Sequence, residues 1–106
     1  MIDWDRVNEL KAEVGTEDFR EVVTLFLEEV DEVIDRLKSR PDSTRFEQDL
    51  HFLKSSSLNL GFATFSGLCR DGERAAREGQ TAAVDLPELI AAYLSSRSEF
   101  LARVNG

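Results

Sequence analysis

The sequence predicts an all-α protein: an antiparallel up-down four-helix bundle with a short additional N-terminal helix. Apolar residues recur at alternating steps of three and four along several segments, which is the period of amphipathic helices, and no run alternates as a strand does. The connections between these segments are short, which favours antiparallel packing of neighbouring helices. The chain has 106 residues and no linker or repeat, so we expect a single domain over residues 1–106.

The first two helices are indicated by residues that favour helix ends. A short helix is expected from Asp3, its N-terminal cap, to Val14, with Gly15 ending it. A long helix is expected from its cap Thr16 to about Ser39. Their predicted apolar stripes are Trp4, Val7, Leu10 and Val14 on the first helix, and Phe19, Val23, Phe26, Val30, Val33 and Leu37 on the second.

The third and fourth helices follow a similar pattern. The third is expected to begin near Ser43 or Thr44, because Thr44 and Glu47 have the spacing of a capping box. The fourth is expected over Phe62–Glu78, and Gly72 in its interior indicates tight packing. The predicted inward residues are Phe46, Leu50, Leu53, Ser57 and Leu60 on the third helix, and Phe65, Leu68, Cys69, Ala75 and Ala76 on the fourth.

The last helix is expected to begin at Asp85, a good N-terminal cap, with Pro87 and Glu88 at early helical positions. It should reach about Val104. Its predicted inward residues are Leu86, Leu89, Ile90, Tyr93, Leu94, Leu101 and Val104.

The composition excludes several classes of function. The chain carries 21 acidic and 13 basic residues, a net charge of −8, which argues against binding to nucleic acid or to anionic membrane surfaces. No apolar run approaches the length of a transmembrane helix, and the N-terminus does not resemble a signal peptide. The single cysteine, Cys69, cannot form an internal disulfide and is expected in the core. We therefore expect a cytoplasmic protein.

His51 is the only histidine in the chain. At 100° per residue it points about 120–140° away from the centre of the apolar stripe of its helix, so we expect its ring to face solvent. An incidental surface histidine remains an alternative. The neighbours favour a site: Lys54 lies three positions on and Ser55, a small residue, four positions on.

Apolar residues are expected beside His51 on the same outward surface. Leu58 lies one turn beyond Ser55, and Phe62 continues the same side. Exposed apolar groups around a polar side chain are typical of a docking surface for another protein. The alternative for Leu58 and Phe62 is contact with another helix or with the end of the bundle.

Histidine with a neighbouring lysine suits phosphoryl carriage. An unperturbed pKa near 6.5 leaves a nucleophilic neutral ring nitrogen at physiological pH. Phosphoryl transfer needs positioning and charge stabilisation more than covalent machinery, and Lys54 can stabilise the equatorial oxygens of the group in transfer.

The segment from His51 to Gly61, His-Phe-Leu-Lys-Ser-Ser-Ser-Leu-Asn-Leu-Gly, resembles the signature of histidine phosphotransfer (HPt) domains of bacterial two-component phosphorelays. That signature is His-x-Leu-Lys-Gly-Ser/Ala-Ser/Ala, followed by an apolar residue and glycine. The resemblance extends over the whole chain, since the expected order of helices is that of the family. One departure is Ser55, where the family usually has glycine; serine is small enough to allow docking, but it could slow transfer, alter partner choice or contact the phosphoryl group.

The resemblance implies a phosphoryl group relayed between receiver-domain aspartates of hybrid histidine kinases and response regulators. It implies that His51 is phosphorylated on its outer nitrogen, that Lys54 neutralises the phosphoryl group, and that Ser57 and Gly61 are small for packing. It also implies a polar side chain on the next helix that hydrogen-bonds the other ring nitrogen. Glu73 is the candidate, and a solvated surface glutamate is the alternative.

Two other functions agree less well with this sequence than phosphoryl carriage does. One histidine and one cysteine do not supply a metal site, the acidic residues Glu28, Glu29, Asp31 and Glu32 fit a solvated helix face, and no glycine loop cradles phosphates. We therefore expect no bound metal, no cofactor and no autonomous kinase activity, with Mg²⁺ supplied by the receiver partner. The second alternative is an HPt-like scaffold that binds receiver domains without carrying phosphate; retention of His51 and Lys54 counts against it. A monomer is expected.

Overall fold

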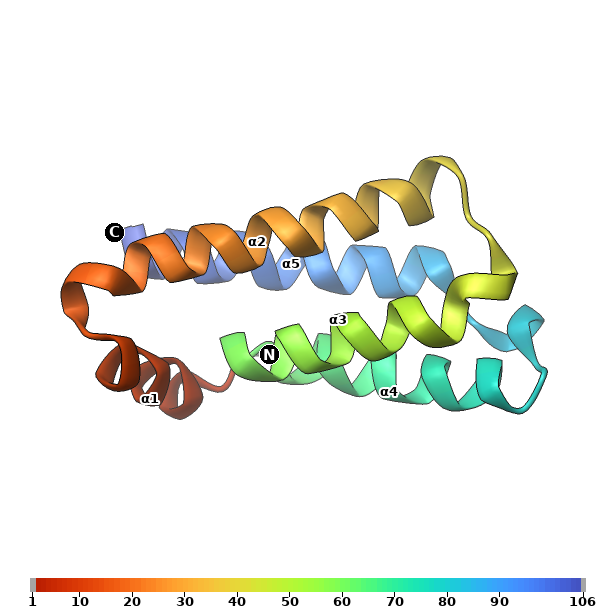
Figure 1. The fold of residues 1–106 in the computed structure, drawn as a ribbon, viewed down its shortest axis with the longest axis horizontal. Coiled ribbons are helices and arrows are strands. Elements are labelled where there is room, and N and C mark those ends of the chain that lie inside the picture. The colour runs from red at the N-terminus through yellow and green to blue at the C-terminus, as the bar shows by residue number, and fades with distance from the viewer. Residues whose placement is uncertain (1, 106) are drawn as a thin grey trace.

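The computed structural model describes residues 2–105, and over these residues the protein contains helices and no strands. Five α-helices and two short 3₁₀-helices follow one another along the chain (Figure 1). Their bounds are α1 (Trp4–Val14), α2 (Thr16–Ser39), η1 (Ser43–Arg45), α3 (Phe46–Leu60), α4 (Ala63–Arg77), η2 (Thr81–Ala83) and α5 (Leu86–Asn105). The all-helical class expected from the sequence is confirmed.

The molecule is elongated, with extents of 42 × 23 × 19 Å. Figure 1 shows α2, α3, α4 and α5 lying along the long axis, with each helix running opposite to the one before it. The shorter α1 lies at one end, where it contacts α2 and α3. The most extensive contact between helices joins α3 and α4, which carry His51 and Glu73.

The ends of α1 form as expected, but the start of α2 does not. The Asp3 carboxylate accepts a hydrogen bond of 3.2 Å from the backbone N–H of Arg6 and so caps α1. Gly15, with φ of +88°, both ends α1 and occupies the N-cap position of α2, where no side chain caps the helix. Thr16 is therefore the first helical residue and not the cap, because the one-residue connection leaves no further position before α2.

The expected capping box before α3 is also wrong. Asp42 accepts hydrogen bonds from the backbone N–H and the hydroxyl of Thr44, at 3.0 and 2.7 Å, and caps η1. The Thr44 hydroxyl is thus engaged as a donor in the turn that precedes α3. Glu47 instead contacts Arg77 on α4, at 3.3 Å, which joins the two helices that form the site.

The core lies along the inner faces of the helices. It includes two residues of α2 that lie outside the apolar stripe predicted from the sequence. Leu27 and Ile34 are buried, whereas Phe26 and Val33 of the predicted stripe are only partly buried against the core. The reason is geometric: α2 contacts α1, α3 and α5, so its inner face is wider than a single stripe. The buried apolar residues are Ile2, Val7, Leu10, Phe19, Val23, Leu27, Val30, Ile34, Leu37, Phe46, Leu50, Leu53, Leu60, Phe62, Phe65, Cys69, Leu89, Tyr93 and Phe100.

The last helix begins as expected but presents one predicted core residue to solvent. The carboxylate of Asp85 accepts a hydrogen bond of 3.0 Å from the backbone N–H of Glu88, which caps α5. Leu94 is 47% exposed, and Phe100 is fully buried in contact with the rings of Trp4 and Phe62. The aromatic ring of Phe100 thus closes the core where α1 meets α5.

A partly buried ion pair holds α2 and α3 in register. Both amino groups of Arg36 on α2 donate to the carboxylate of Asp49 on α3, each at 2.8 Å. Asp49 lies two residues before His51, so this pair holds the α3 segment that carries the histidine. A bidentate arginine–carboxylate pair constrains both distance and orientation.

Gly72 brings α4 close to α3, as its position suggested. A Cβ atom at Gly72 would lie 2.9 Å from Cδ1 of Leu50, closer than real side chains approach. The absence of a side chain at Gly72 therefore permits the close packing of the two helices. Glu73 directly follows Gly72 on α4, and His51 directly follows Leu50 on α3. The contact between Gly72 and Leu50 therefore sets the distance between Glu73 and His51.

Candidate functional site

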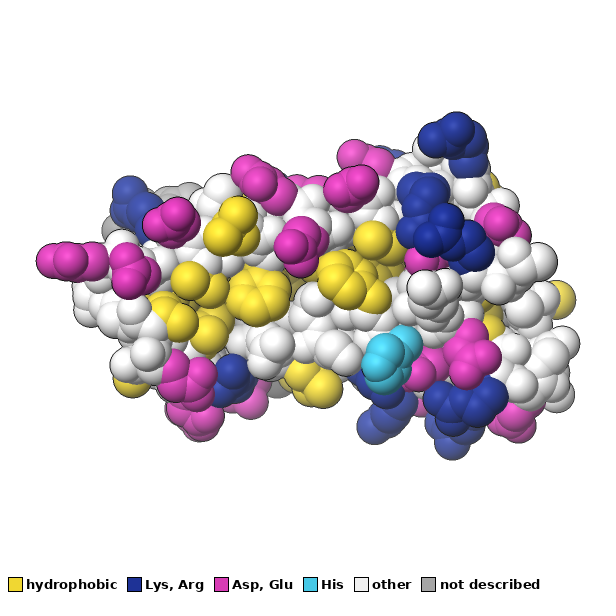
Figure 2. All heavy atoms as spheres, viewed as in Figure 1, with side chains coloured by type: hydrophobic (Ala, Val, Ile, Leu, Met, Phe, Trp, Pro, Cys, Tyr) yellow, Lys and Arg dark blue, Asp and Glu magenta, His cyan; other side chains and the backbone are white. Residues whose placement is uncertain are grey.

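The His51 side chain lies in the middle of α3 and is 62% exposed. Figure 2 shows its ring on the surface, with acidic and basic side chains close beside it. The expectation that the ring faces solvent is confirmed. Another protein can therefore reach the imidazole without any rearrangement of the helices.

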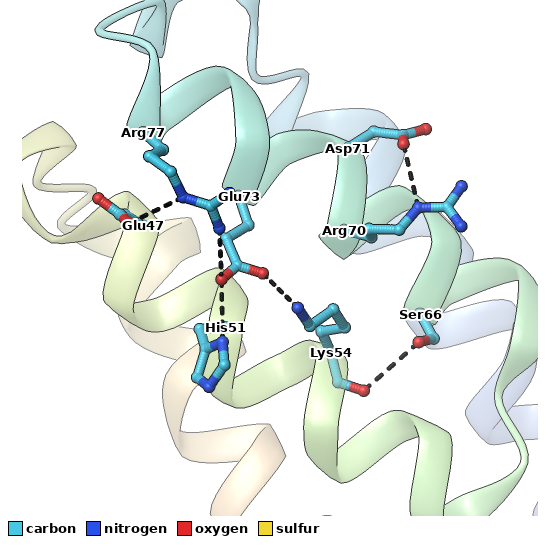
Figure 3. A network of polar contacts seen from close by, with 8 residues as sticks. All are labelled: Glu47, His51, Lys54, Ser66, Arg70, Asp71, Glu73 and Arg77. Carbon is cyan, nitrogen blue, oxygen red and sulfur yellow. Dashed lines mark hydrogen bonds and ion pairs between the residues drawn. The ribbon is translucent and has the colours of Figure 1, made fainter.

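A buried carboxylate holds one side of the ring. Glu73 on α4 is only 4% exposed, and its Oε2 lies 2.9 Å from Nδ1 of His51. An ionised carboxylate can only accept, so the proton of a neutral ring is held at Nδ1. The Nε2 lone pair is then left unprotonated, and Figure 3 shows that this edge of the ring points away from Glu73.

Two cationic side chains, Lys54 and Arg77, also contact the Glu73 carboxylate. Nζ of Lys54 lies 2.6 Å from Oε1 of Glu73, and Nη2 of Arg77 lies 3.2 Å from Oε2 (Figure 3). Burial raises the pKa of Glu73, but the hydrogen bonds from Lys54 and His51 outweigh this effect and bring the pKa below the ordinary value of 4.5. Glu73 is therefore ionised at neutral pH, which is the form that the ring contact requires.

Arg77 and Glu47 belong to this network and were not identified as a pair from the sequence. Nε of Arg77 lies 3.3 Å from Oε2 of Glu47, so the guanidinium bridges Glu47 and Glu73 across the two helices. A sequence signal existed: Arg77 follows Glu73 by four positions, and Glu47 precedes His51 by four. This spacing places each pair on one helix face, but only the packing of α3 on α4 brings the two faces together.

The apolar part of the expected docking surface is smaller than predicted. Leu58 is 55% exposed and Ser55 is exposed, as expected. Phe62 is fully buried, with its ring 6.1 Å from that of Tyr93 and 5.4 Å from that of Phe100, so it does not line a docking surface. The helical angle extrapolated to Phe62 fails because α3 ends at Leu60, and the chain turns inward after its cap, Gly61.

Ser57 is buried, and Gly61 lies where a side chain would collide with the backbone. Ser57 is 1% exposed, packed behind the outward face of α3. Gly61 has φ of +81°, and a Cβ atom there would lie 2.6 Å from the carbonyl oxygen of Asp3. The carbonyl of Gly61 also accepts a hydrogen bond of 2.7 Å from the N–H of Asp3. Gly61 thus caps the C-terminus of α3, and its backbone contacts Asp3 at the start of α1.

Comparison with known protein families decides the classification of the chain. The family model of the Hpt domain matches residues 21–99, which include His51, Lys54 and Glu73. The chain belongs to the Hpt domain family. Hpt domains act in two-component signalling as phosphoryl carriers that interact with receiver domains, and they are not kinases. No curated protein and no solved structure matches this chain with significance.

Basic side chains border the site of this Hpt domain. Lys54, Arg70, Arg74 and Arg77 line a shallow hollow together with Glu73. Arg70 and Arg74 both contact the carboxylate of one residue, Asp71, at 3.4 and 3.1 Å. The arginines thus fringe the site, and they also compensate nearby carboxylates.

Residues 2–105 of the Hpt domain contain neither a cluster of metal-ligating side chains nor a helix that could span a membrane. Within this range no group of three or more histidine, cysteine, aspartate or glutamate side chains could hold a metal ion. None of the helices described there is long and apolar enough to cross a membrane. Cys69 is fully buried, and burial raises the pKa of its thiol, so it is a core residue as expected.

Proposed function

We propose that this Hpt domain relays a phosphoryl group between receiver-domain aspartates through Nε2 of His51. One observation carries the proposal: the buried carboxylate of Glu73 lies 2.9 Å from Nδ1, on the side of the ring opposite the exposed nitrogen. An imidazole held in this tautomer presents a nucleophile to solvent and needs no base to activate it.

The transfer step balances without any group beyond the two proteins and the receiver's Mg²⁺. The Nε2 lone pair of His51 attacks phosphorus in line, the Nε2–P bond forms, and the bond from phosphorus to the aspartyl oxygen breaks. The leaving electron pair returns to the receiver carboxylate. The ring keeps its Nδ1 proton and becomes a phosphoimidazolium, whose positive charge the Glu73 carboxylate stabilises at hydrogen-bond distance. Reversal of the same step returns the phosphoryl group to a second receiver.

Lys54 has a role on both sides of this step. Before transfer its ammonium lies 2.6 Å from Oε1 of Glu73, and its side chain remains 25% exposed. A partly exposed lysine can turn from this carboxylate to the phosphoryl oxygens once they arrive, because its stem is flexible. We assign to Lys54 the neutralisation of phosphoryl charge, while the receiver supplies Mg²⁺ and most of the remaining charge stabilisation.

The surface around His51 is proposed to dock the receiver domain. Leu58 offers an exposed apolar side chain two turns beyond the histidine, and Ser55 leaves room beside the ring. We further propose that α2–α5 constitute the antiparallel four-helix bundle expected from the sequence, and that the chain acts as one domain and as a monomer.

The direct test is incubation with radiolabelled phospho-receiver domains from the same cell, sampled at short times. The proposal predicts label on the wild-type protein and none on His51→Gln, whose amide cannot form the phosphoramidate. The scaffold alternative predicts receiver binding without label on either protein. Label that persists on His51→Gln would refute the assignment of His51.

A further inference from the structure

A cavity of about 570 Å³ lies between α1, α2 and the end of α5. Figure 1 shows these three segments meeting at one end of the molecule. None of the residues that line the cavity belongs to α3 or α4, so it is separate from the phosphotransfer site. Its volume is within the range of small-molecule sites in proteins, about 300–1,000 Å³.

Apolar side chains make up seven of the thirteen residues that line the cavity, and several of them belong to the core. Phe19, Val23 and Leu27 of α2 are buried residues that also line the cavity. Trp4 contributes the opposite side, with its ring stacked on Phe100 at 5.9 Å. An apolar chain that entered the cavity would therefore contact core side chains and be removed from water.

Three cationic side chains border this apolar space. Lys11, Arg20 and Arg103 line the cavity, and no aspartate or glutamate of the described residues does. This lining is unusual in a chain with 21 acidic and 13 basic residues. The local charge is thus opposite in sign to the net charge of −8 carried by the whole protein.

These three cations are not committed to carboxylates within residues 2–105. None of them forms an ion pair within 4.0 Å there, whereas seven other basic residues do: Arg6, Arg36, Lys54, Arg70, Arg74, Arg77 and Arg97. Nζ of Lys11 lies 5.9 Å from the ring centroid of Phe19, and Cζ of Arg103 lies 4.3 Å from that of Trp4. Two of the charges are therefore held over the aromatic walls of the cavity, where an anion could meet them.

We propose that this cavity binds a small anionic amphiphile, a single-chain carboxylate whose apolar tail enters between α1, α2 and α5. The tail would bury against Phe19 and Leu27, and the carboxylate would accept hydrogen bonds from Lys11, Arg20 or Arg103. An apolar interior combined with uncompensated cations favours this class of ligand over two others. A neutral apolar molecule would gain no binding energy from the charges. A short anion would gain none from the apolar walls.

The sole tryptophan provides the readout, because Trp4 lines the cavity. Titration of the full chain with octanoate should change Trp4 emission in a saturable manner, and amide chemical shifts should move around the cavity rather than around His51. The neutral analogue 1-octanol and the short anion acetate should each bind at least about tenfold more weakly, since each lacks one of the two interactions.

Two variants of equal charge separate specific binding from general electrostatics. Substitution of glutamine for Lys11, Arg20 and Arg103 should weaken octanoate binding about tenfold or more. Substitution of glutamine for Lys38, Arg40 and Arg45, which are also exposed and outside any ion pair with the described carboxylates, should leave it unchanged. Thermal unfolding of both variants without ligand checks that each is folded, and octanoate should raise the melting temperature of the wild type and of the control variant only.

Several outcomes would overturn the proposal. These are octanoate binding that does not saturate, 1-octanol that binds as tightly as octanoate, or equal weakening in the two triple variants. Emission changes produced by vesicles of anionic lipid and not by octanoate would also overturn it, because they would assign this face to a membrane surface.

Discussion

The Glu73 carboxylate oxygen Oε2 lies 2.9 Å from Nδ1 of His51, so a buried charge on α4 determines which nitrogen of an exposed ring on α3 is available. This relationship predicts the tautomer of the free protein. Nitrogen NMR of isotope-labelled wild type at neutral pH should show His51 protonated at Nδ1 whenever the ring is neutral. In Glu73→Gln the amide can orient either way, and the two tautomers should mix.

Glu73 also predicts an effect on rate. We expect Glu73→Gln to slow transfer from a phosphorylated receiver about tenfold, because a charge-assisted hydrogen bond to the developing phosphoimidazolium becomes a neutral one. Rapid-quench measurement of phosphohistidine formation gives the rate. A Glu73→Gln rate equal to that of the wild type would remove the carboxylate from the mechanism, even if its contact with the ring persists.

Lys54→Ala should slow transfer about tenfold or more, or shorten the lifetime of phosphohistidine by a comparable factor, because the phosphoryl oxygens lose the cation assigned to neutralise them. The lifetime is measured after the receiver has been removed. Lys11→Ala is the control, since this exposed lysine lies on α1, outside the site. Identical kinetics for Lys54→Ala and wild type would exclude the assigned role.

Leu58 and Leu25 offer a matched test of the docking surface. Both are exposed leucines, at 55% and 54%, on α3 and α2 respectively. We expect Leu58→Asp to weaken receiver binding about tenfold, by calorimetry, because an apolar contact is replaced by a charge. Leu25→Asp should bind as the wild type does. Normal affinity for Leu58→Asp would show that the receiver docks elsewhere.

The glycines of α3 and α4 predict opposite effects on stability. Gly61→Ala should destabilise the fold by about 2 kcal/mol or more, because its backbone is left-handed and its Cβ would lie 2.6 Å from a carbonyl oxygen. Gly67→Ala should stabilise by up to about 1 kcal/mol, since it lies in α4 with open space around it. Urea denaturation of both variants measures the difference, and equal stabilities would contradict the close approach at Gly61.

The lowered pKa of Glu73 predicts a dependence of stability on pH. Since the pKa in the folded state lies below 4.5, the ionised carboxylate stabilises the fold at higher pH, and this stabilisation is lost as pH falls through the folded pKa. The stability advantage of wild type over Glu73→Gln should therefore be constant above about pH 6 and shrink below pH 4.5. Chemical denaturation at several pH values measures it, and an advantage that grows on acidification would reverse the sign of the argument.

The sequence was sufficient to predict those features of the site that depend only on the position of a residue within one helix. The exposure of His51 and the proximity of Lys54 follow from the period of α3 alone. The position of Phe62 was wrong because it was extrapolated along a helix that ends at Leu60, two residues earlier. The bridge from Arg77 to Glu47 could not be predicted, because it depends on how closely α4 approaches α3, which Gly72 sets through tertiary packing.

The identity of the phosphorylated atom is the most direct test of phosphoryl carriage by Nε2 of His51. Isotope-labelled protein, phosphorylated by a phospho-receiver domain and examined by nitrogen–hydrogen correlation NMR of the histidine ring, identifies the modified nitrogen. The predicted result is phosphorylation of His51 at Nε2 with the proton still on Nδ1. Phosphorylation at Nδ1, or at any residue other than His51, would contradict it.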